Sequence, residues 1–366
     1  GIRLAHKLLE QLGYEGKVFF STSGSEANET AFKIARQYHA QTAPAGSGPR
    51  YKVISRYRGY HGHTMGALSA TAQAERKIKY EPLVPGFLHV SPPYQYRFGE
   101  GRSEDVYNAA CLQELEQTIL YEGAESVAAV IVEPIISGGG VIVPPAGYLR
   151  GVREICDRTG ILLIYDEVVN GFGRTGRLFG HQHWGVEPDI ITFAKGLTSG
   201  YMPLSATVVK QSIFEAFLDD PGSDSHFRHI TTYGGTPVCT AVGLRSIEIL
   251  ERENLCERAA EMGEYLLGRL QRLLDHPNVG DVRGRGLLLG VEMVEDKASK
   301  TPLGSAAMAT ITQYCMGKQT IIGRNTNTIP GFTNVLILCP PLVVTREEAD
   351  RLADTLYDAV FALPSS

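Results

Sequence analysis

The chain has 366 residues, 43% of them hydrophobic and 20% charged, which is typical of a globular protein that folds into one large domain or two domains. Its formal net charge of −5 argues against nucleic acid as a partner, because nucleic-acid binding requires a clustered basic surface. No apolar run is long enough to span a bilayer, and six scattered cysteines without a C-x-x-C pair indicate reduced thiols, so we expect a cytoplasmic protein with no membrane or metal partner.

The first elements of the chain lead to a candidate phosphate site. An amphipathic helix is expected directly after Gly1, and because no initiator methionine precedes it, we expect an N-terminal segment of the full protein to be missing. A short strand over 18–20 leads to a second helix, whose start is marked by a capping box of Ser23 and Glu26. Free N–H groups at a helix start can bind phosphate, but this segment alone favours an ordinary helix cap.

Strands and helices then alternate as in an α/β protein. A strand over 51–55 precedes an aromatic and histidine-rich loop, in which Tyr60 could lie flat on a planar ligand. The histidine pairs of the chain have no carboxylate at ligand spacing, so we expect no metal site. The proline-rich segment 75–101 is expected to be an irregular surface excursion. A helix over 108–121, a strand over 127–132 that ends at Glu133, and a helix over 149–158 follow.

Two apolar runs that end in opposite charges organise the centre of the chain. The run 161–165 ends in Asp166, and the run 190–194 ends in Lys195. Runs of this kind are typical of buried parallel strands, and ligands bind such sheets at the carboxyl ends of the strands. A lysine after a strand is more often a solvated side chain when it stands alone. Here the flanking sequences of both runs fit one pattern, so we expect Asp166 and Lys195 to face the same small molecule.

A glycine-rich run lies between these two strands. Residues 171–176 fit G-x-G-x-x-G, the pattern of dinucleotide-binding proteins, but residues 177–189 lack the helical periodicity that should follow it. We therefore interpret the glycines as turn formers. A nicotinamide-dependent oxidoreductase remains a less favoured alternative.

The C-terminal third has a different character. After a strand over 204–209 and a hydroxyl-rich turn over 231–237, a long helical region extends to about residue 274. It is followed by a strand pair over 279–294, a helix over 305–316, strands near Ile321 and Leu336, and a last helix over 345–363. We expect residues 1–240 to form a large cofactor-binding domain and residues 241–366 a small α+β domain.

With these motifs in this order, the chain resembles the class III pyridoxal-phosphate-dependent aminotransferases of fold type I. The resemblance covers the whole chain through STSGSEANE, YRGYHGHT, IVEPI, LLIYDEVVNGFGRTG, FAKGLTSGYMPLSA and LCPPL. Residues 196–203 and 323–334 are similar to the ω-amino acid–pyruvate group, which includes the taurine–pyruvate aminotransferases. The resemblance implies an α/β fold with a mostly parallel central sheet, pyridoxal 5'-phosphate as cofactor, and a homodimer with shared active sites.

The resemblance also implies the roles of particular residues. Lys195 would carry the cofactor and move a proton, and Asp166 would pair with the cofactor's ring nitrogen. The residues implied to bind the cofactor or the substrate are Val168 and Tyr60 on the two ring faces, Gly24 and Ser25 at the phosphate, Thr232 at the phosphate of the neighbouring subunit, Glu133 in the active site, and Arg324 as a mobile carboxylate-binding arginine.

The residues and the resemblance together predict a reaction. An unprotonated lysine can bind an aldehyde cofactor, and a buried carboxylate beside the ring nitrogen favours its protonated form, which withdraws electrons. We expect transamination from an ω-amino acid or amine, such as taurine or β-alanine, to pyruvate or another keto acid. An aminomutase or a decarboxylase would use Lys195 and Asp166 equally well and stays an alternative.

Overall fold

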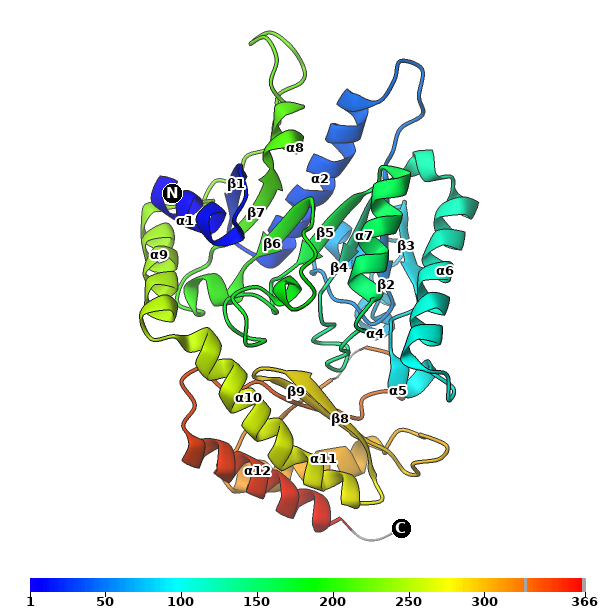
Figure 1. Cartoon of the computed structure of the whole chain (residues 1–366), viewed down its shortest axis with the longest axis vertical. Helices are drawn as coiled ribbons and strands as arrows, with labels where there is room; N and C mark the ends of the chain where they lie inside the picture. The colour runs from blue at the N-terminus through cyan, green and yellow to red at the C-terminus, as the bar shows by residue number, and fades with distance from the viewer. Residues whose placement is uncertain (326–327, 364–366) are drawn as a thin grey trace.

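The larger part of the protein is built on a seven-stranded sheet with the order β1-β7-β6-β5-β4-β2-β3 (Figure 1). The computed structural model describes residues 1–325 and 328–363. The strands are β1 (Gly16–Ser21), β2 (Lys52–Arg56), β3 (Phe87–Val90), β4 (Val127–Val132), β5 (Leu162–Asp166), β6 (Ile190–Phe193) and β7 (Ser205–Lys210). Strands β3, β2, β4, β5 and β6 pair in parallel, whereas β7 is antiparallel to both β6 and β1. The predicted α/β fold with a mostly parallel central sheet is confirmed.

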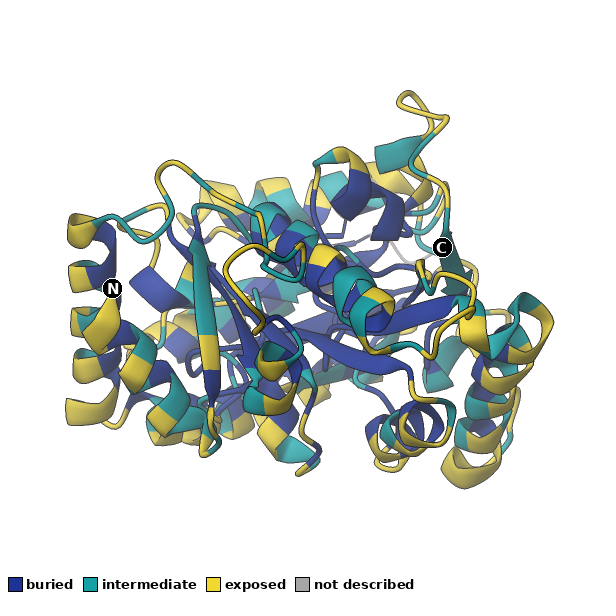
Figure 2. Ribbon diagram, turned by 90° about the horizontal axis from the view of Figure 1, so that it is seen from above, coloured by how far each residue is buried: buried dark blue, intermediate teal, exposed yellow. Residues whose placement is uncertain are grey.

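Helices cover both faces of this sheet, as the continuous apolar strands require. In β4, Ala129 and Ile131 pack in one cluster with Ala31 and Phe32 of α2, while Val130 and Val132 pack in another with residues of α7. Figure 2 shows the buried strands in the middle and exposed residues on the outer sides of the helices. The helices of this part are α1 (Ile2–Leu12), α2 (Gly24–Thr42), α3 (Met65–Ala70), α4 (Ala74–Lys77), α5 (Gln95–Phe98), α6 (Glu104–Glu122), α7 (Tyr148–Thr159), α8 (Gln211–Glu215) and α9 (Pro237–Arg252), with single 3₁₀ turns η1 (Ala124–Ser126), η2 (Gly180–His183) and η3 (Lys195–Thr198).

The prediction of an irregular excursion over 75–101 is wrong. This segment contains α4, α5 and the edge strand β3, which pairs in parallel with β2 from Val53↔Phe87 to Arg56↔Val90. Prolines on both sides conceal a four-residue strand from a sequence pattern, because alternation over four residues is too short to distinguish a strand from a loop.

The C-terminal part forms a smaller antiparallel sheet with the order β10-β11-β9-β8, packed against three helices (Figure 1). Its strands are β8 (Val279–Arg285), β9 (Leu288–Met293), β10 (Gly323–Arg324) and β11 (Val335–Leu338). Its helices are α10 (Leu255–Gln271), α11 (Ser305–Gly317) and α12 (Arg346–Phe361), with the 3₁₀ turn η4 (Arg272–Asp275) after α10. The strand predicted near Ile321 is the two-residue β10.

The apolar cores suggest where the two domains divide. Ile247 and Leu250 of α9 belong to the core of the large part, whereas the core of the small part begins at Ala259 in α10. Leu255 at the start of α10 still belongs to the core of the large part, so we propose that the boundary lies in the first turn of α10, between Leu255 and Ala259, and not at the expected residue 240.

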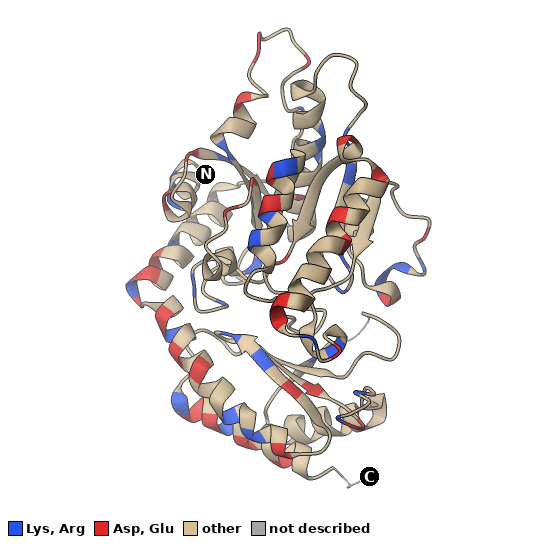
Figure 3. Ribbon diagram, turned by 45° about the vertical axis from the view of Figure 1, so that its right-hand side comes forward, with Lys and Arg blue, Asp and Glu red and all other residues tan. Residues whose placement is uncertain are grey.

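The surface carries charges of both signs. Acidic and basic side chains alternate along the outer helices instead of gathering by sign (Figure 3). Among the residues that the structure describes, no helix combines the length and the apolar character needed to cross a membrane.

Candidate active site

Loops that follow five strands meet around one cavity of about 480 Å³. Strands β1, β2, β4, β5 and β6 all run in the same direction, so their carboxyl ends lie at one edge of the sheet. Seven of the predicted site residues line this cavity: Gly24, Ser25, Tyr60, Glu133, Asp166, Val168 and Lys195. Parallel topology therefore brings together residues that are up to 171 positions apart in the chain (24 to 195).

Two predicted site residues do not line the cavity in this chain. Thr232 is exposed in the turn before α9. Arg324 lies in β10 opposite Leu336, with its Nη1 atom buried and unpaired within the described part of the chain. The predicted role of Thr232 requires a partner subunit, and that of Arg324 requires a movement of its side chain. Both roles stay predictions.

Asp166 is held by three hydrogen-bonding groups at the end of β5. Its Oδ2 atom accepts from Nδ2 of Asn28 at 2.8 Å and lies 2.9 Å from Nδ1 of His61. Its Oδ1 atom accepts from the backbone N–H of Val168 at 3.0 Å. The carboxylate is only 3% exposed, so these bonds fix its direction within the cavity wall.

The adjacent carboxylate, Glu167, has a different task. It accepts from the backbone N–H groups of Gly180 (2.8 Å) and His181 (2.7 Å), and Nδ1 of His181 lies 2.9 Å away. Neighbouring residues at a strand end point to opposite sides, so only one carboxylate of the pair reaches the cavity. Glu167 instead holds the turn that leads to η2.

Lys195 follows β6 as the first residue of the 3₁₀ turn η3, and it lines the cavity. Its amine is accessible from the cavity, yet protein crowds it on the other sides, and this desolvation lowers the pKa of Lys195, an effect that the negative charges of Asp166 and Glu133 oppose. The backbone of Lys195 has a φ of 37°, in the left-handed region that non-glycine residues rarely adopt. A strained backbone at a strand end is typical of a functional site.

Glu133 lies at the end of β4, fully buried. Its Oε1 atom accepts from the N–H of Tyr60 at 3.1 Å, and its Oε2 atom accepts from the N–H and Oγ of Ser137 at 3.0 and 2.7 Å. Burial, with a smaller contribution from the charge of Asp166, raises the pKa of Glu133. Both oxygens are used to fix the loops that carry Tyr60 and Ser137.

The start of α2 forms a cradle at the cavity wall. The predicted capping box is confirmed: Ser23 Oγ accepts from the N–H of Glu26, and Glu26 Oε2 accepts from the N–H of Ser23. A Cβ atom on Gly24 would lie 3.0 Å from both Cγ atoms of Val168. Gly62, with a φ of 143°, approaches Ser25 so closely that a Cβ atom would lie 2.5 Å from its Oγ. Only glycine permits this close approach at the positive end of the helix.

Several cavity residues were missed by the sequence analysis: Asn28, Gln73, Arg76 and Ser137, with His61 considered only as a metal ligand. Asn28 lies about one helical turn after Gly24 and Ser25, a spacing that places it on the same face of α2 and that could have identified it. Arg76 lies in the segment 75–101, which the sequence analysis interprets as irregular, and Gln73 lies just before it. No sequence pattern indicates that these two residues reach the cavity.

The glycine-rich run 171–176 forms turns, as predicted. In the described part of the chain it is followed by the 3₁₀ turn η2 and not by the helix of a dinucleotide-binding unit.

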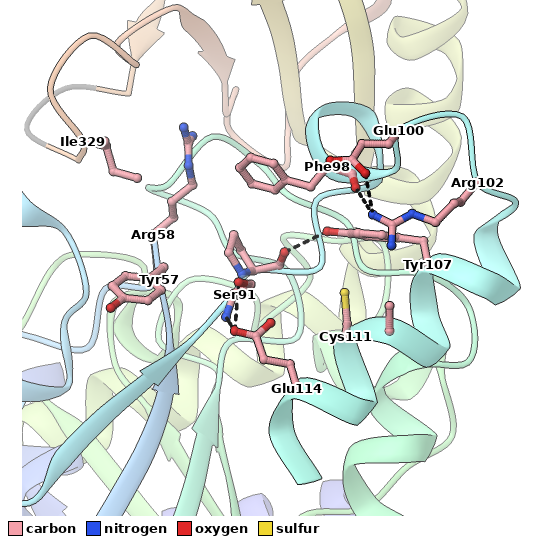
Figure 4. A pocket seen from close by; sticks show the side chains of 12 residues that line it. Tyr57, Arg58, Ser91, Phe98, Glu100, Arg102, Tyr107, Cys111, Glu114 and Ile329 are labelled. Carbon is pink, nitrogen blue, oxygen red and sulfur yellow. Dashed lines mark hydrogen bonds and ion pairs between the residues drawn. The ribbon is translucent and has the colours of Figure 1, made fainter. Parts of the chain in front are cut away.

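A second cavity, of about 450 Å³, is shown in Figure 4. Its polar groups bond to one another: Glu114 accepts from the N–H and Oγ of Ser91 at 2.9 Å, and Tyr107 Oη donates to the carbonyl of Pro92 at 3.1 Å. None of the predicted site residues lines it.

Comparison with known proteins gives the context of this site. The model of the family "Aminotransferase class-III" matches residues 2–360. The chain is 51% identical to the uncharacterized aminotransferase YhxA of Bacillus subtilis over 358 residues, which are 98% of this chain and 78% of that protein. It is 44% identical to the taurine–pyruvate aminotransferase of Bilophila wadsworthia over 353 residues, 96% of this chain and 76% of that protein.

Solved structures agree in fold. The ω-transaminase of Pseudomonas jessenii in complex with PMP superposes with a TM-score of 0.92 and 38% identity, covering 98% of this chain and 78% of that one. The match spans both sheets of the present structure.

Proposed function

The chain belongs to the class III aminotransferase family and is a pyridoxal-phosphate-dependent aminotransferase, and on this premise we propose that it transfers the amino group of an ω-amino acid or amine, such as taurine or β-alanine, to pyruvate. The observation that carries the proposal is the single cavity in which an amine of lowered pKa, Lys195, lies with the buried carboxylate of Asp166. The likeness to the taurine–pyruvate aminotransferase supports the choice of donor and acceptor.

The residues of the cavity fit the cofactor. Pyridoxal phosphate, when bound, supplies an aldehyde that reacts with amines and a ring that accepts electrons from the substrate. The cradle at Gly24 and Ser25 suits a phosphate, since N–H groups at the start of α2 lie at the helix's positive end. Asp166 suits a protonated ring nitrogen because its carboxylate is buried and fixed in direction. Tyr60 and Val168 would pack on the two ring faces.

The chain's own groups would divide the chemistry as follows. Lys195 would hold the cofactor through its neutral Nζ. With a donor in the cavity, Nζ would take the proton from the amine-bearing carbon of the donor and pass it to the cofactor, which would keep the amino group while the donor leaves as a carbonyl compound. Crowding by protein makes Nζ neutral at a lower pH than an exposed lysine would be. Asp166 keeps the proton on the ring nitrogen, and Glu133 holds the Tyr60 loop in place. The same groups then act in reverse on pyruvate.

A donor panel tests this function. The purified protein, loaded with pyridoxal phosphate, is given taurine, β-alanine, 1-propylamine or putrescine with pyruvate, and alanine formation is measured. We expect alanine together with the aldehyde made from the donor. Carbon dioxide release or an isomerised amino acid without alanine would instead indicate a decarboxylase or an aminomutase.

We propose a homodimer, because large apolar residues are exposed around Thr232. Ile230 is 91% exposed and Tyr233 71%, both within two residues of Thr232 in the chain, and large exposed apolar side chains that lie together are typical of an interface. Thr232 would then reach the phosphate bound by the partner.

Substitution at this surface tests the proposed dimer. Ile230→Asp should shift the sedimentation coefficient from dimer towards monomer and reduce activity in parallel, because a charge in an apolar interface is left unpaired. Leu120→Asp is the matched control, since Leu120 is 73% exposed on α6, away from this surface. A wild-type chain that is active as a monomer would contradict the proposal.

Arg324 is proposed to bind the carboxylate of pyruvate after a movement into the cavity. A guanidinium binds a carboxylate through two parallel hydrogen bonds. Arg324→Ala should therefore raise the KM for pyruvate about 10- to 100-fold, which is the effect expected when hydrogen bonds to a charged group are lost. The KM should be measured with an amine donor that carries no anionic group, so that pyruvate is the only anionic substrate. An unchanged KM would remove Arg324 from the site.

A further inference from the structure

We propose that Arg76 binds the anionic end of the amino donor, a carboxylate or a sulfonate, and thereby determines which donors the enzyme prefers. This inference rests on the proposed function. It is drawn from the position of Arg76 in the cavity wall, which the sequence did not reveal.

Two contacts hold the side chain of Arg76, which lies on α4, in place. Its Nε donates to Oε1 of Gln73 at 2.7 Å, and its guanidinium carbon lies 4.9 Å from the centre of the Tyr60 ring. Gln73 is itself buried and donates through Nε2 to the carbonyl of Arg58 at 2.9 Å. A guanidinium held by its Nε atom and by a ring face is preorganised, so less side-chain entropy is lost when a ligand binds.

The outer nitrogens of this guanidinium remain available. The bond from Nε to Gln73 is the only hydrogen bond that the side chain of Arg76 makes to the part of the chain that the structure describes, and this side chain forms no ion pair there. Both η nitrogens can therefore donate to one oxyanion in the fork geometry that suits carboxylates and sulfonates.

The charges around the cavity favour an anionic ligand at Arg76. The two carboxylates that line the cavity are already used: Glu133 accepts from the loops of Tyr60 and Ser137, and Asp166 accepts from Asn28 and Val168. Lys195 and Arg76 are the lysine and arginine side chains among its described lining residues, and since Lys195 is assigned to the cofactor, Arg76 remains as the permanent cation for a substrate. Its position beside Tyr60 places this cation next to the proposed cofactor site.

Arg76 and Arg324 would thus serve different anions. Arg76 lines the cavity in this structure, whereas Arg324 lies in β10 of the small domain and must move to reach it. An ω-amino acid carries its anion several bonds from the reacting carbon, and pyruvate carries it on the adjacent carbon. Two arginines at two distances can accommodate both substrates in one cavity.

The test compares Arg76→Gln with Arg324→Gln. Half-reaction rates are measured by single-turnover spectroscopy with β-alanine, taurine and 1-propylamine, the last being an analogue of similar length that lacks the anionic group. Arg76→Gln should lower kcat/KM for β-alanine and taurine about 10- to 100-fold, because two hydrogen bonds to a charged group are lost. The value for 1-propylamine and the KM for pyruvate should stay unchanged. Unequal losses for β-alanine and taurine would show which oxyanion the site prefers.

Anion binding provides a measurement that does not depend on turnover. Propionate and ethanesulfonate carry the anion without an amine, and their Kd can be measured by calorimetry on the holoenzyme. In Arg76→Gln the Kd should rise about 10- to 100-fold, with recovery of part of the affinity in Arg76→Lys. The control Arg245→Gln removes the same charge from an exposed site on α9 and should change neither Kd nor rates.

The outcomes separate the two proposals. Equal losses for donors with and without an anionic group would mean that Arg76 only positions Tyr60, and this result, or unchanged anion affinity, overturns the inference. Wild-type turnover of 1-propylamine with no preference for anionic donors overturns it as well, while aminotransfer stands. If the wild type transfers no amino group from any donor, the proposed function fails, and the calorimetric comparison still decides whether Arg76 binds anions.

Discussion

Replacing Lys195 with alanine is expected to abolish transamination while the protein still folds and binds pyridoxal phosphate non-covalently. The lost proton transfer alone should lower kcat by roughly 10²–10⁴-fold, and the loss of covalent binding adds to this effect. The fold should persist because the side chain of Lys195 projects into a cavity and packs in none of the apolar clusters. Alanine formation and the absorbance of the bound cofactor measure the two effects separately.

A matched lysine serves as the control. Lys210 also ends a strand, β7, but this strand is antiparallel to β6, so Lys210 lies at the opposite edge of the sheet. It is paired with Glu187 at 3.6 Å, and Lys210→Ala should keep near wild-type activity. Borohydride reduction of the wild-type holoenzyme followed by peptide mapping should place the pyridoxyl group on Lys195. Labelling of any other lysine contradicts the assignment.

The lowered pKa of Lys195 also predicts a pH dependence. Covalent attachment of pyridoxal phosphate requires the neutral amine, whose fraction grows as pH rises through the pKa of Lys195. The attachment rate should therefore increase with pH and level off below the pH expected for an exposed lysine, near 10.5. Stopped-flow mixing of apoprotein with cofactor measures this profile. A plateau that is reached only above that pH would mean that desolvation does not lower the pKa of Lys195.

Asp166→Asn is expected to reduce kcat severely and to leave the fold intact. An amide cannot stabilise a protonated ring nitrogen, and the loss of one preorganised electrostatic group of this kind costs on the order of 10²–10³-fold in kcat. Asparagine can still accept from the N–H of Val168, so cofactor binding should weaken only moderately. Its amide nitrogen would face the donor of Asn28, which removes one of the bonds to the side chain. Single-turnover kinetics with a saturating donor measure the chemical step directly.

The neighbouring carboxylate supplies the contrast. Glu167→Gln places an amide beside the N–H groups of Gly180 and His181, so one buried donor loses its acceptor. We expect a loss of about 1–3 kcal/mol in the free energy of unfolding, the cost of an unsatisfied buried group, with a smaller effect on kcat than Asp166→Asn. Urea unfolding and kinetics on the same preparations distinguish the two roles. If Asp166→Asn keeps a wild-type kcat, its assigned role is wrong.

The sequence by itself determined the edge of the sheet at which we propose the active site. Apolar runs that end in Asp166 and Lys195 could be recognised because a strand buried on both faces must be apolar throughout, and the first charged residue marks its end. The capping box of Ser23 and Glu26 was equally readable, since it is a local hydrogen-bond pattern spanning four residues. The family motifs then supplied the cofactor.

Only the tertiary structure decided which side chains complete the site. Asn28 and His61 reach Asp166 across 138 and 105 residues, and Arg76 reaches the cavity from a segment whose pattern indicated an irregular loop. The short strand β3 is extended because its backbone groups form hydrogen bonds with the free edge of β2. Local patterns encode burial and helix ends, whereas the direction of a loop side chain depends on the backbone packed beside it. For this reason the sequence located the lysine and the aspartate, and the fold revealed the second arginine.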